Sequence, residues 1–252
     1  MAELLLLGTG AALNDGSREP TMLALAGPRS TVLIDCGGNA VRQLQLLHVP
    51  LTSVECVILT HAHPDHTSGF PLLVEMLWLA GWRGTLPVHG PAEAVGAVSR
   101  AFKQWDTSRW TDLPALAWHI VPPAQGAPIA LGADFELSAA PGVHAGNEVI
   151  AVRARARDTG RTVVYSADGE PSPGVAGLAA GADILVHEAT GEGYGHSTAE
   201  GAARLAREAG AAELILVHLA PDKIDLAAAA AAARGIFPGP VVVGEDLQRF
   251  MF

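Results

Sequence analysis

Four side chains that commonly bind metal ions lie within six residues, in the segment His61-Ala62-His63-Pro64-Asp65-His66. The apolar run Val57-Ile58-Leu59-Thr60 precedes it and predicts a buried strand whose end would deliver the imidazoles from a rigid edge. His61 and His63 are two residues apart, so an extended backbone points both the same way. Pro64 then favours a turn that brings the remaining carboxylate and imidazole from another direction. Imidazole nitrogen and carboxylate oxygen suit zinc, with manganese or iron as alternatives, and the arrangement favours two adjacent cations over one.

The pattern of an apolar strand followed by histidine recurs late in the chain. Leu214-Ile215-Leu216-Val217 leads into His218, as the earlier run leads into His61. A second echo pairs the stretch 31–38 with the stretch 162–169, each an apolar run that ends in aspartate and glycine. These echoes predict two similar halves that meet at a cleft, where the second half supplies the ligands that a two-metal site still needs.

A wider set of residues follows a series known from one superfamily. The series is the 61–66 cluster, then His144, Asp168 and His218 in that order. It resembles the ligand series of the metallo-β-lactamase superfamily, over nearly the whole chain. Within that superfamily the sequence is most similar to the ribonuclease Z group and its phosphodiesterase relatives. This closer likeness is carried by Leu7-Gly8-Thr9-Gly10, Asp35-Cys36-Gly37, Asp65-His66-Thr67-Ser68-Gly69, His187-Glu188-Ala189-Thr190 and Gly195-His196-Ser197-Thr198.

The resemblance implies an α/β fold, a four-layer αββα sandwich with two pseudo-symmetric halves. It also implies two divalent metal ions, in the first instance Zn²⁺, with Mn²⁺ or Fe as alternatives. One ion would be bound by His61, His63 and His144. The other would be bound by Asp65, His66 and His218, with Asp168 bridging the two. A hydroxide held between two cations is a nucleophile at neutral pH, and the same cations offset charge on a phosphoryl oxygen.

The resemblance assigns further roles beside the ions. Asp65 would also orient the hydroxide. His196 would stabilise the transition state or protonate the leaving oxygen, since Ser197-Thr198-Ala199-Glu200 predicts a capping box that begins a helix directly after it. Glu188 would support the site from behind the ligands. The alternatives are a surface histidine beside a helix cap for His196 and a structural role for Glu188.

The sequence departs from the ribonuclease Z group where that group holds its substrate. Those enzymes carry a long tRNA-binding arm between the equivalents of His144 and Asp168, whereas only 23 residues separate the two here. This length suffices for a hairpin that turns at Asp158-Thr159-Gly160. The glycine and threonine usual around the bridging aspartate are replaced in Ala167-Asp168-Gly169, and the arginine expected after the last histidine is missing. Lys223 is a candidate substitute as a point charge.

The charge balance opposes binding of a long polyanion. The chain has 16 Lys and Arg against 26 Asp and Glu, a formal net charge of −10, whereas affinity for nucleic acid draws on basic patches. Arg153, Arg155 and Arg157 alternate along a predicted strand and therefore share one face. That face either contacts phosphate or forms a solvated edge that discourages strand addition.

These features predict a metal-dependent hydrolase, a dinuclear phosphodiesterase that acts on a small ester such as a cyclic nucleotide. Three alternatives stay open. The first is a ribonuclease Z-like tRNA 3′ endonuclease that uses another basic surface. The second is a carboxylester, thioester or lactone hydrolase, because the same hydroxide attacks a carbonyl. The third is a protein that keeps the metal site without turnover.

Length and composition fit one domain over residues 1–252. The chain is 49% hydrophobic, and no Pro-, Gly- or Ser-rich linker divides it. No segment is predicted to span a membrane or to act as a signal peptide. Cys36 and Cys56 are too few for a disulfide scaffold, so we expect a cytoplasmic protein. A homodimer is expected only from the family resemblance.

Hydrophobic periodicity predicts where the strands and helices lie. The predicted strands are 3–8, 21–26, 30–35, 54–60, 134–140, 148–156, 161–166, 183–188, 213–218 and 240–243. The predicted helices are 39–48, 67–80, 91–103, 173–180, 199–209 and 223–234. All five tryptophans fall between residues 78 and 118, where they are candidates for a cleft wall, a dimer contact or core packing. Structural roles are expected for His48, His89, His119 and His187.

Overall fold

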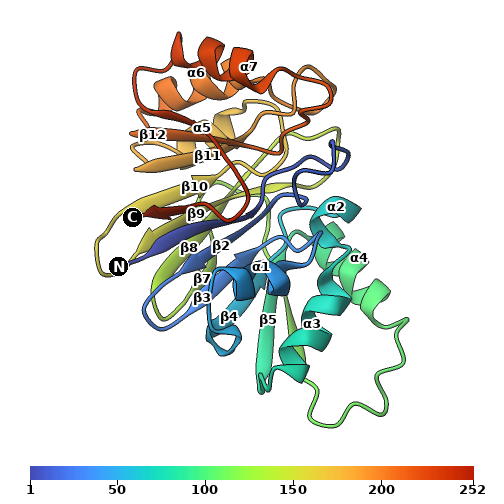
Figure 1. The fold of residues 1–252 in the computed structure, drawn as a ribbon. Coiled ribbons are helices and arrows are strands. Elements are labelled where there is room, and N and C mark those ends of the chain that lie inside the picture. Colours follow the sequence, from blue (N-terminus) through green and yellow to red (C-terminus); the bar gives the residue numbers. More distant parts are fainter.

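Runs of leucine, isoleucine, valine and alanine form two seven-stranded sheets in the computed structural model, which describes all 252 residues (Figure 1). The first sheet has the order β14-β1-β2-β3-β4-β5-β6 and the second β13-β12-β11-β10-β9-β8-β7. The strands of the first sheet are β1 (Glu3–Gly8), β2 (Met22–Ala26), β3 (Thr31–Ile34), β4 (Val54–Ile58), β5 (Thr85–Gly90), β6 (Ala115–Ile120) and β14 (Arg249–Met251). Those of the second are β7 (Ala127–Leu131), β8 (Phe135–Pro141), β9 (Ile150–Ala156), β10 (Thr162–Tyr165), β11 (Ile184–Glu188), β12 (Glu213–Val217) and β13 (Val241–Val243).

The two sheets repeat one topology. In the first, β1, β2 and β3 are antiparallel neighbours, and β4, β5 and β6 then continue parallel to β3. In the second, β8, β9 and β10 are antiparallel and β11, β12 and β13 continue parallel to β10. Each sheet gains one more antiparallel edge strand, β14 beside β1 and β7 beside β8. The predicted two similar halves are therefore present as architecture.

Three apolar cores separate the layers. The central core joins the inner faces of both sheets, with Ile34 and Ile58 from one and Val152 and Val186 from the other. A second core lies under η1 (Leu51–Ser53), α1 (Ala40–Leu46), α3 (Phe70–Leu79) and α4 (Ala92–Phe102). A third lies under α5 (Pro173–Leu178), α6 (Ala199–Ala209) and α7 (Leu226–Arg234), and Figure 1 shows these two helical groups on opposite sides. The predicted four-layer αββα sandwich is confirmed.

Four strands escaped prediction from the sequence: β5, β6, β7 and β14. β5 and β6 carry proline, histidine and tryptophan in place of a clear apolar alternation, and β6 and β7 are sheet edges. β14 has three residues and exists because it pairs with β1 at the other end of the chain. The predicted 67–80 helix is divided into α2 (Pro64–Thr67) and α3 at Gly69, where a Cβ would lie 2.2 Å from the carbonyl oxygen of Gly38.

The start of α6 differs from the predicted capping box by one residue. The N-cap is Thr198, whose side chain accepts a hydrogen bond from the backbone N–H of Gly201. Ser197, the predicted cap, donates its hydroxyl to the carbonyl of Thr198 instead. The Ser-x-x-Glu spacing was therefore a misleading signal, because the neighbouring threonine is also a favoured N-cap residue.

The arginine strip lies on a central strand, so its interpretation as a sheet edge was wrong. β9 pairs with β8 on one side and β10 on the other. Arg153 donates to the carbonyl of Leu178 at the end of α5, at 2.6 Å. Arg155 and Arg157 form ion pairs with Glu136 at 3.4 and 3.6 Å. The strip is an outer face held by local partners.

The tryptophans serve several purposes. Trp82 is buried and donates its indole N–H to the carbonyl of Val54. The rings of Trp78 and Trp110 stack in parallel with centroids 5.1 Å apart, and Trp118 packs against Phe70. Trp105 is 62% exposed beside α4. None of the helices combines the length and the hydropathy that spanning a membrane requires.

Candidate metal centre

The predicted site residues converge at the carboxyl ends of the parallel strands, where open α/β sheets commonly bind ligands. Loops leave the sheets there, and five residues of the centre stand at or just beyond a strand end. These residues are Asp35 after β3, His61 after β4, Asp168 after β10, Glu188 at the end of β11 and His218 after β12. His144 comes from the loop between β8 and β9, and His196 from the segment before α6. Both halves of the chain thus build one site.

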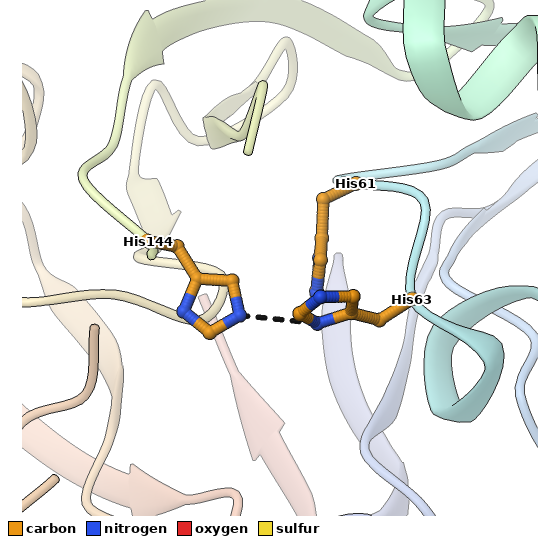
Figure 2. A group of neighbouring side chains, drawn as sticks. All are labelled: His61, His63 and His144. Atoms are coloured by element: carbon orange, nitrogen blue, oxygen red, sulfur yellow. Dashed lines mark hydrogen bonds between the residues drawn. The ribbon is translucent and has the colours of Figure 1, made fainter. Parts of the chain in front are cut away.

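The first group of side chains is His61, His63 and His144 (Figure 2). Their ring centroids lie 4.7 to 5.1 Å apart. His63 Nδ1 is 3.1 Å from His144 Nε2, the contact that Figure 2 marks. His61 and His144 are buried, whereas His63 is partly exposed. One ring nitrogen from each of the three histidines lies close enough to the other two for the group to bind a single ion.

The second group is Asp65, His66, Asp168 and His218. Asp168 Oδ2 lies 3.0 Å from His218 Nε2 and 3.3 Å from His66 Nε2. It also lies 3.9 Å from His61 Nε2, which belongs to the first group. Asp65 Oδ2 is 3.3 Å from His218 Nε2. The Asp168 carboxylate therefore faces both groups, the position expected of a bridging ligand.

Three buried atoms in these groups have no hydrogen-bond partner: His61 Nε2, His66 Nε2 and Asp168 Oδ1. An unpaired buried polar atom costs about 1–3 kcal/mol, so three together call for an explanation. All three belong to the two groups whose atoms converge, and they are the nitrogen and oxygen donors that divalent ions prefer. The donor set therefore fits divalent metal ions.

Asp35 orients the imidazole of His66 directly and that of His61 through Thr60. It is fully buried and accepts hydrogen bonds from His66 Nδ1, from the Thr60 amide and from the Thr60 hydroxyl, each at 2.8 Å. The Thr60 hydroxyl is also 3.0 Å from His61 Nδ1. Because the Nδ1 atoms of His61 and His66 are occupied in this way, their Nε2 atoms face the centre.

The other imidazoles have their own outer partners. His144 Nδ1 donates to the carbonyl of Gly195 at 2.5 Å. His218 Nδ1 lies 2.7 Å from the hydroxyl of Thr190. His63 Nε2 lies 3.3 Å from the side-chain amide of Asn147. Asn147, Thr190 and Thr60 were not predicted as site residues, because an isolated Asn or Thr has no spacing signal in the sequence.

His196 stands at the mouth of the centre, paired with Glu188. Its Nδ1 is 2.9 Å from Glu188 Oε1, and its side chain is 24% exposed. Its ring lies 4.8 Å from that of His144 and 5.6 Å from that of His218. Glu188 is fully buried and also accepts from the backbone N–H groups of Ser197 and Gly169. The hydrogen bond to Glu188 raises the pKa of His196.

The electrostatics of the centre suit cations. Burial and the nearby His66 lower the pKa of His61 to about 2, so its imidazole is neutral. Burial acts to raise the pKa of Asp65, but the hydrogen bond from His218 and the charge of His66 outweigh it and bring the pKa to about 2. Burial likewise opposes ionisation of Asp168, yet His218 and His66 hold its pKa well below the usual range. His61 and the two carboxylates therefore have the forms that bind metal, whereas, against the effect of burial, Asp168 and Asp35 raise the pKa of His66, so His66 releases a proton when metal binds.

The candidate Lys223 and three histidines expected to be structural lie outside the two groups. Lys223 is an exposed residue in the loop after His218. His89 and His119 stack on each other at 4.8 Å, and buried His187 donates its Nδ1 to the carbonyl of Glu188. None of these histidines belongs to the groups that could hold an ion.

The chain is similar to known proteins over most of its length. The family model described as "Beta-lactamase superfamily domain" matches residues 30–219. Ribonuclease Z of Methanothermobacter thermautotrophicus is 30% identical over 98% of this chain and 96% of its own length, and ribonuclease Z of Bacillus licheniformis is 32% identical over 86% and 88%.

Two solved structures share the fold. The metallo-beta-lactamase fold protein YhfI from Bacillus subtilis superposes with a TM-score of 0.80 at 22% identity, covering 99% of this chain and 98% of that one. The short form of human tRNase Z also gives 0.80, at 21% identity and the same coverage. The resemblance seen in the sequence is confirmed: the chain belongs to the beta-lactamase superfamily.

Proposed function

We propose that the protein is a metal-dependent hydrolase that cleaves small phosphodiesters. The observation that carries this is the pair of adjacent ligand groups joined by one carboxylate, Asp168, which faces histidines of both. Adjacent cations are the usual device for stabilising both oxygens of an in-line displacement at phosphorus.

In this proposal the two groups hold one ion each, and zinc suits their ligands best. The first ion is bound by His61, His63 and His144. The second is bound by Asp65, His66 and His218, with Asp168 shared. When bound, two such ions supply a Lewis acid for a phosphoryl oxygen and lower the pKa of water.

The residues around the ions divide the proton transfers. Asp65 is an ionised carboxylate at the partly exposed rim, 3.3 Å from His218, so it can orient a water molecule for attack. His196 donates a proton to the leaving oxygen. Because Glu188 occupies its Nδ1, the Nε2–H is the free donor, and the raised pKa keeps that proton available at higher pH.

The absence of a long arm favours a small substrate. β9 and β10 form a tight hairpin whose turn lies at residues 157–160, as predicted. The alignment with the Methanothermobacter ribonuclease Z spans 307 positions, whereas this chain has 252 residues, so that relative has stretches with no counterpart here. The net charge of −10 and the outward-facing arginines of β9 also provide little to grip a polyanion.

Two exposed apolar side chains lie next to site residues in the chain. Val143 precedes His144, and Tyr194, which is 82% exposed, lies two residues before His196. Gly195, which lies between Tyr194 and His196, packs against Ala145: a Cβ added to Gly195 would lie 2.6 Å from the backbone nitrogen of Ala145. The loop that carries His144 and the loop that carries His196 are therefore adjacent. We therefore expect an ester with a flat or apolar group, as in a nucleotide.

A ribonuclease Z-like tRNA 3′ endonuclease is the second candidate, because relatives that match most of this chain carry that name. Binding of precursor tRNA would then depend steeply on salt. A gel-shift series at rising salt separates this candidate from the first.

The deciding experiment compares bis(p-nitrophenyl) phosphate, p-nitrophenyl acetate, a thioester and precursor tRNA on protein whose metal content is measured by mass spectrometry. We expect about two metals per chain and turnover of the phosphodiester. Asp168→Ala should lose both metals and turnover. Turnover of the carboxylic ester or thioester alone, with two metals bound, would contradict the proposed phosphodiester chemistry. Full metal content without turnover of any of these substrates would contradict the proposal that the protein is an enzyme.

A further inference from the structure

A cavity of about 390 Å³ lies between the two sheets, on the side where β6 and β7 are the edge strands. One wall is the inner face of the first sheet, with Val32, Cys56 and His89. The other wall belongs to the second sheet and includes Ile129 and Leu137. None of the residues that line the cavity belongs to the two metal-ligand groups. The volume is that of a small-molecule site, since such sites span about 300–1,000 Å³.

Strand alternation directs His89 toward this cavity. On β5, Leu86 and Val88 pack under the helices, so Pro87 and His89 face the second sheet. His89 is 7% exposed, and its Nδ1 is buried without a hydrogen-bond partner. Its ring stacks on that of His119, the register partner on β6, with centroids 4.8 Å apart. Stacking gives the imidazole no hydrogen bond, so the protein leaves a buried polar group unsatisfied in the wall of an apolar cavity.

The charges around the cavity favour an uncharged ligand. No Lys or Arg lines it, and the carboxylate of Glu55, which does, would repel an anion. Burial and the neighbouring His119 lower the pKa of His89 to about 4, so this imidazole is neutral at pH 7. A cation would lose its hydration against apolar walls. A neutral imidazole has one donor and one acceptor nitrogen, and a hydroxyl group can pair with either, because it both donates and accepts.

We propose that this cavity is a binding site for a small uncharged molecule that has a flat apolar body and one hydroxyl group, as a phenol does. The body packs between Val32 of the first sheet and Ile129 and Leu137 of the second. A flat body suits a space whose walls are two sheets, because facing sheets pack about 10 Å apart. The hydroxyl forms a hydrogen bond with the imidazole of His89. The site is separate from the metal centre, so its ligand is not the substrate of the proposed hydrolase.

One pair of probes and two variants separate the apolar and the polar parts of this recognition. The probes are 2-naphthol and naphthalene, which differ only by the hydroxyl. Ala130→Phe fills the cavity, because Ala130 lines it and packs against the central core. His89→Phe keeps a ring and removes its hydrogen bond. The matched control is Ala176→Phe, since Ala176 is also a partly buried alanine but packs against the third core, under the helices.

The experiment titrates the Zn²⁺-loaded protein with each probe and follows the methyl signals in ¹³C NMR spectra. Ile129 and Leu137 report on the cavity, and Val143, beside His144, reports on the metal centre. We expect 2-naphthol to shift the Ile129 and Leu137 signals with a Kd of about 0.1–1 mM. Naphthalene should bind about 2–12-fold more weakly, the worth of one hydrogen bond.

Each variant should change one part of the binding. His89→Phe should weaken 2-naphthol by about the same 2–12-fold factor and leave naphthalene unchanged. Ala130→Phe should abolish binding of both probes, and Ala176→Phe should bind both as the wild type does.

Four results would overturn the inference. They are unchanged signals of Ile129 and Leu137, shifts confined to Val143, equal affinity of the wild type for both probes, and wild-type affinity in Ala130→Phe. The first three need no variant, so they decide the matter even if Ala130→Phe does not fold. No readout uses a substrate, so failure of phosphodiester hydrolysis would leave all of them intact.

Discussion

Replacing Asp35 with asparagine should weaken both the fold and the metal centre. Oδ2 of Asp35 accepts from the Thr60 hydroxyl and from His66 Nδ1, and Oδ1 accepts from the Thr60 amide. If asparagine keeps its oxygen on the Thr60 amide, its NH₂ group faces the N–H of His66, donor against donor. The Thr60 hydroxyl can rotate to accept, but His66 cannot without moving its proton to Nε2.

The magnitude follows from these contacts. Hydrogen bonds to a charged group contribute about 1.5–3 kcal/mol each, so losing the bond to His66 and weakening the others should lower the free energy of unfolding by about 2–4 kcal/mol. A proton on His66 Nε2 blocks the atom assigned to the metal, and loss of such an outer partner typically costs about 10–100-fold in metal affinity. Both effects have one cause, the unpaired N–H of His66.

Urea unfolding of the metal-stripped protein measures the first effect, and Zn²⁺ competition measures the second. Asp134→Asn is the control, because Asp134 is also buried and accepts from Arg29 and Ser30 but contacts no histidine. It should lose stability and keep its metal affinity. Unchanged Zn²⁺ affinity in Asp35→Asn would refute the idea that Asp35 orients His66.

Three further predictions concern the proposed chemistry. His196→Ala should keep both metals and lower kcat by about 10²–10⁴-fold, the usual contribution of a proton donor; loss of metal would show that His196 is a ligand. Glu188→Gln removes the negative charge that, with the hydrogen bond, raises the pKa of His196, so the high-pH limb of the kcat profile should move to lower pH, because the donor must stay protonated; an unmoved limb would assign that limb to another group. Removing metal with a chelator should abolish turnover and lower Tm, and Zn²⁺ should restore both. The reason is that a ligand at about 1,000 times its Kd stabilises the folded state by about 4 kcal/mol. A Tm that does not change would mean that the centre binds no metal tightly.

The sequence predicted the parts of the site that have a local signal. A cluster of histidines after an apolar strand requires only short-range geometry, and the second strand that ends at His218 repeats it. The outer partners have no such signal. Asn147 contacts His63 across 84 residues of chain, and Thr190 contacts His218 across 28, so only the folded arrangement brings them together.

The same division holds for the fold. Strands buried on both faces, such as β3 and β12, appeared as nearly continuous apolar runs. β6 was missed because it lies at an edge, where most side chains are partly exposed and apolar periodicity fades. β14 was missed because three residues are too few to form a pattern, and pairing with β1 alone makes them a strand.

The pairing of β14 with β1 bears on how the chain is made. The second sheet has all its strands once residue 243 has been synthesised, whereas the first waits for residues 249–251. Until then one edge of β1, with buried Leu4 and Leu5, offers open backbone groups to any other strand. During synthesis on the ribosome, the first sheet therefore starts to form before the second but is completed after it. The edge of β1 stays unpaired for longest, so pairing with a wrong strand is most to be expected there.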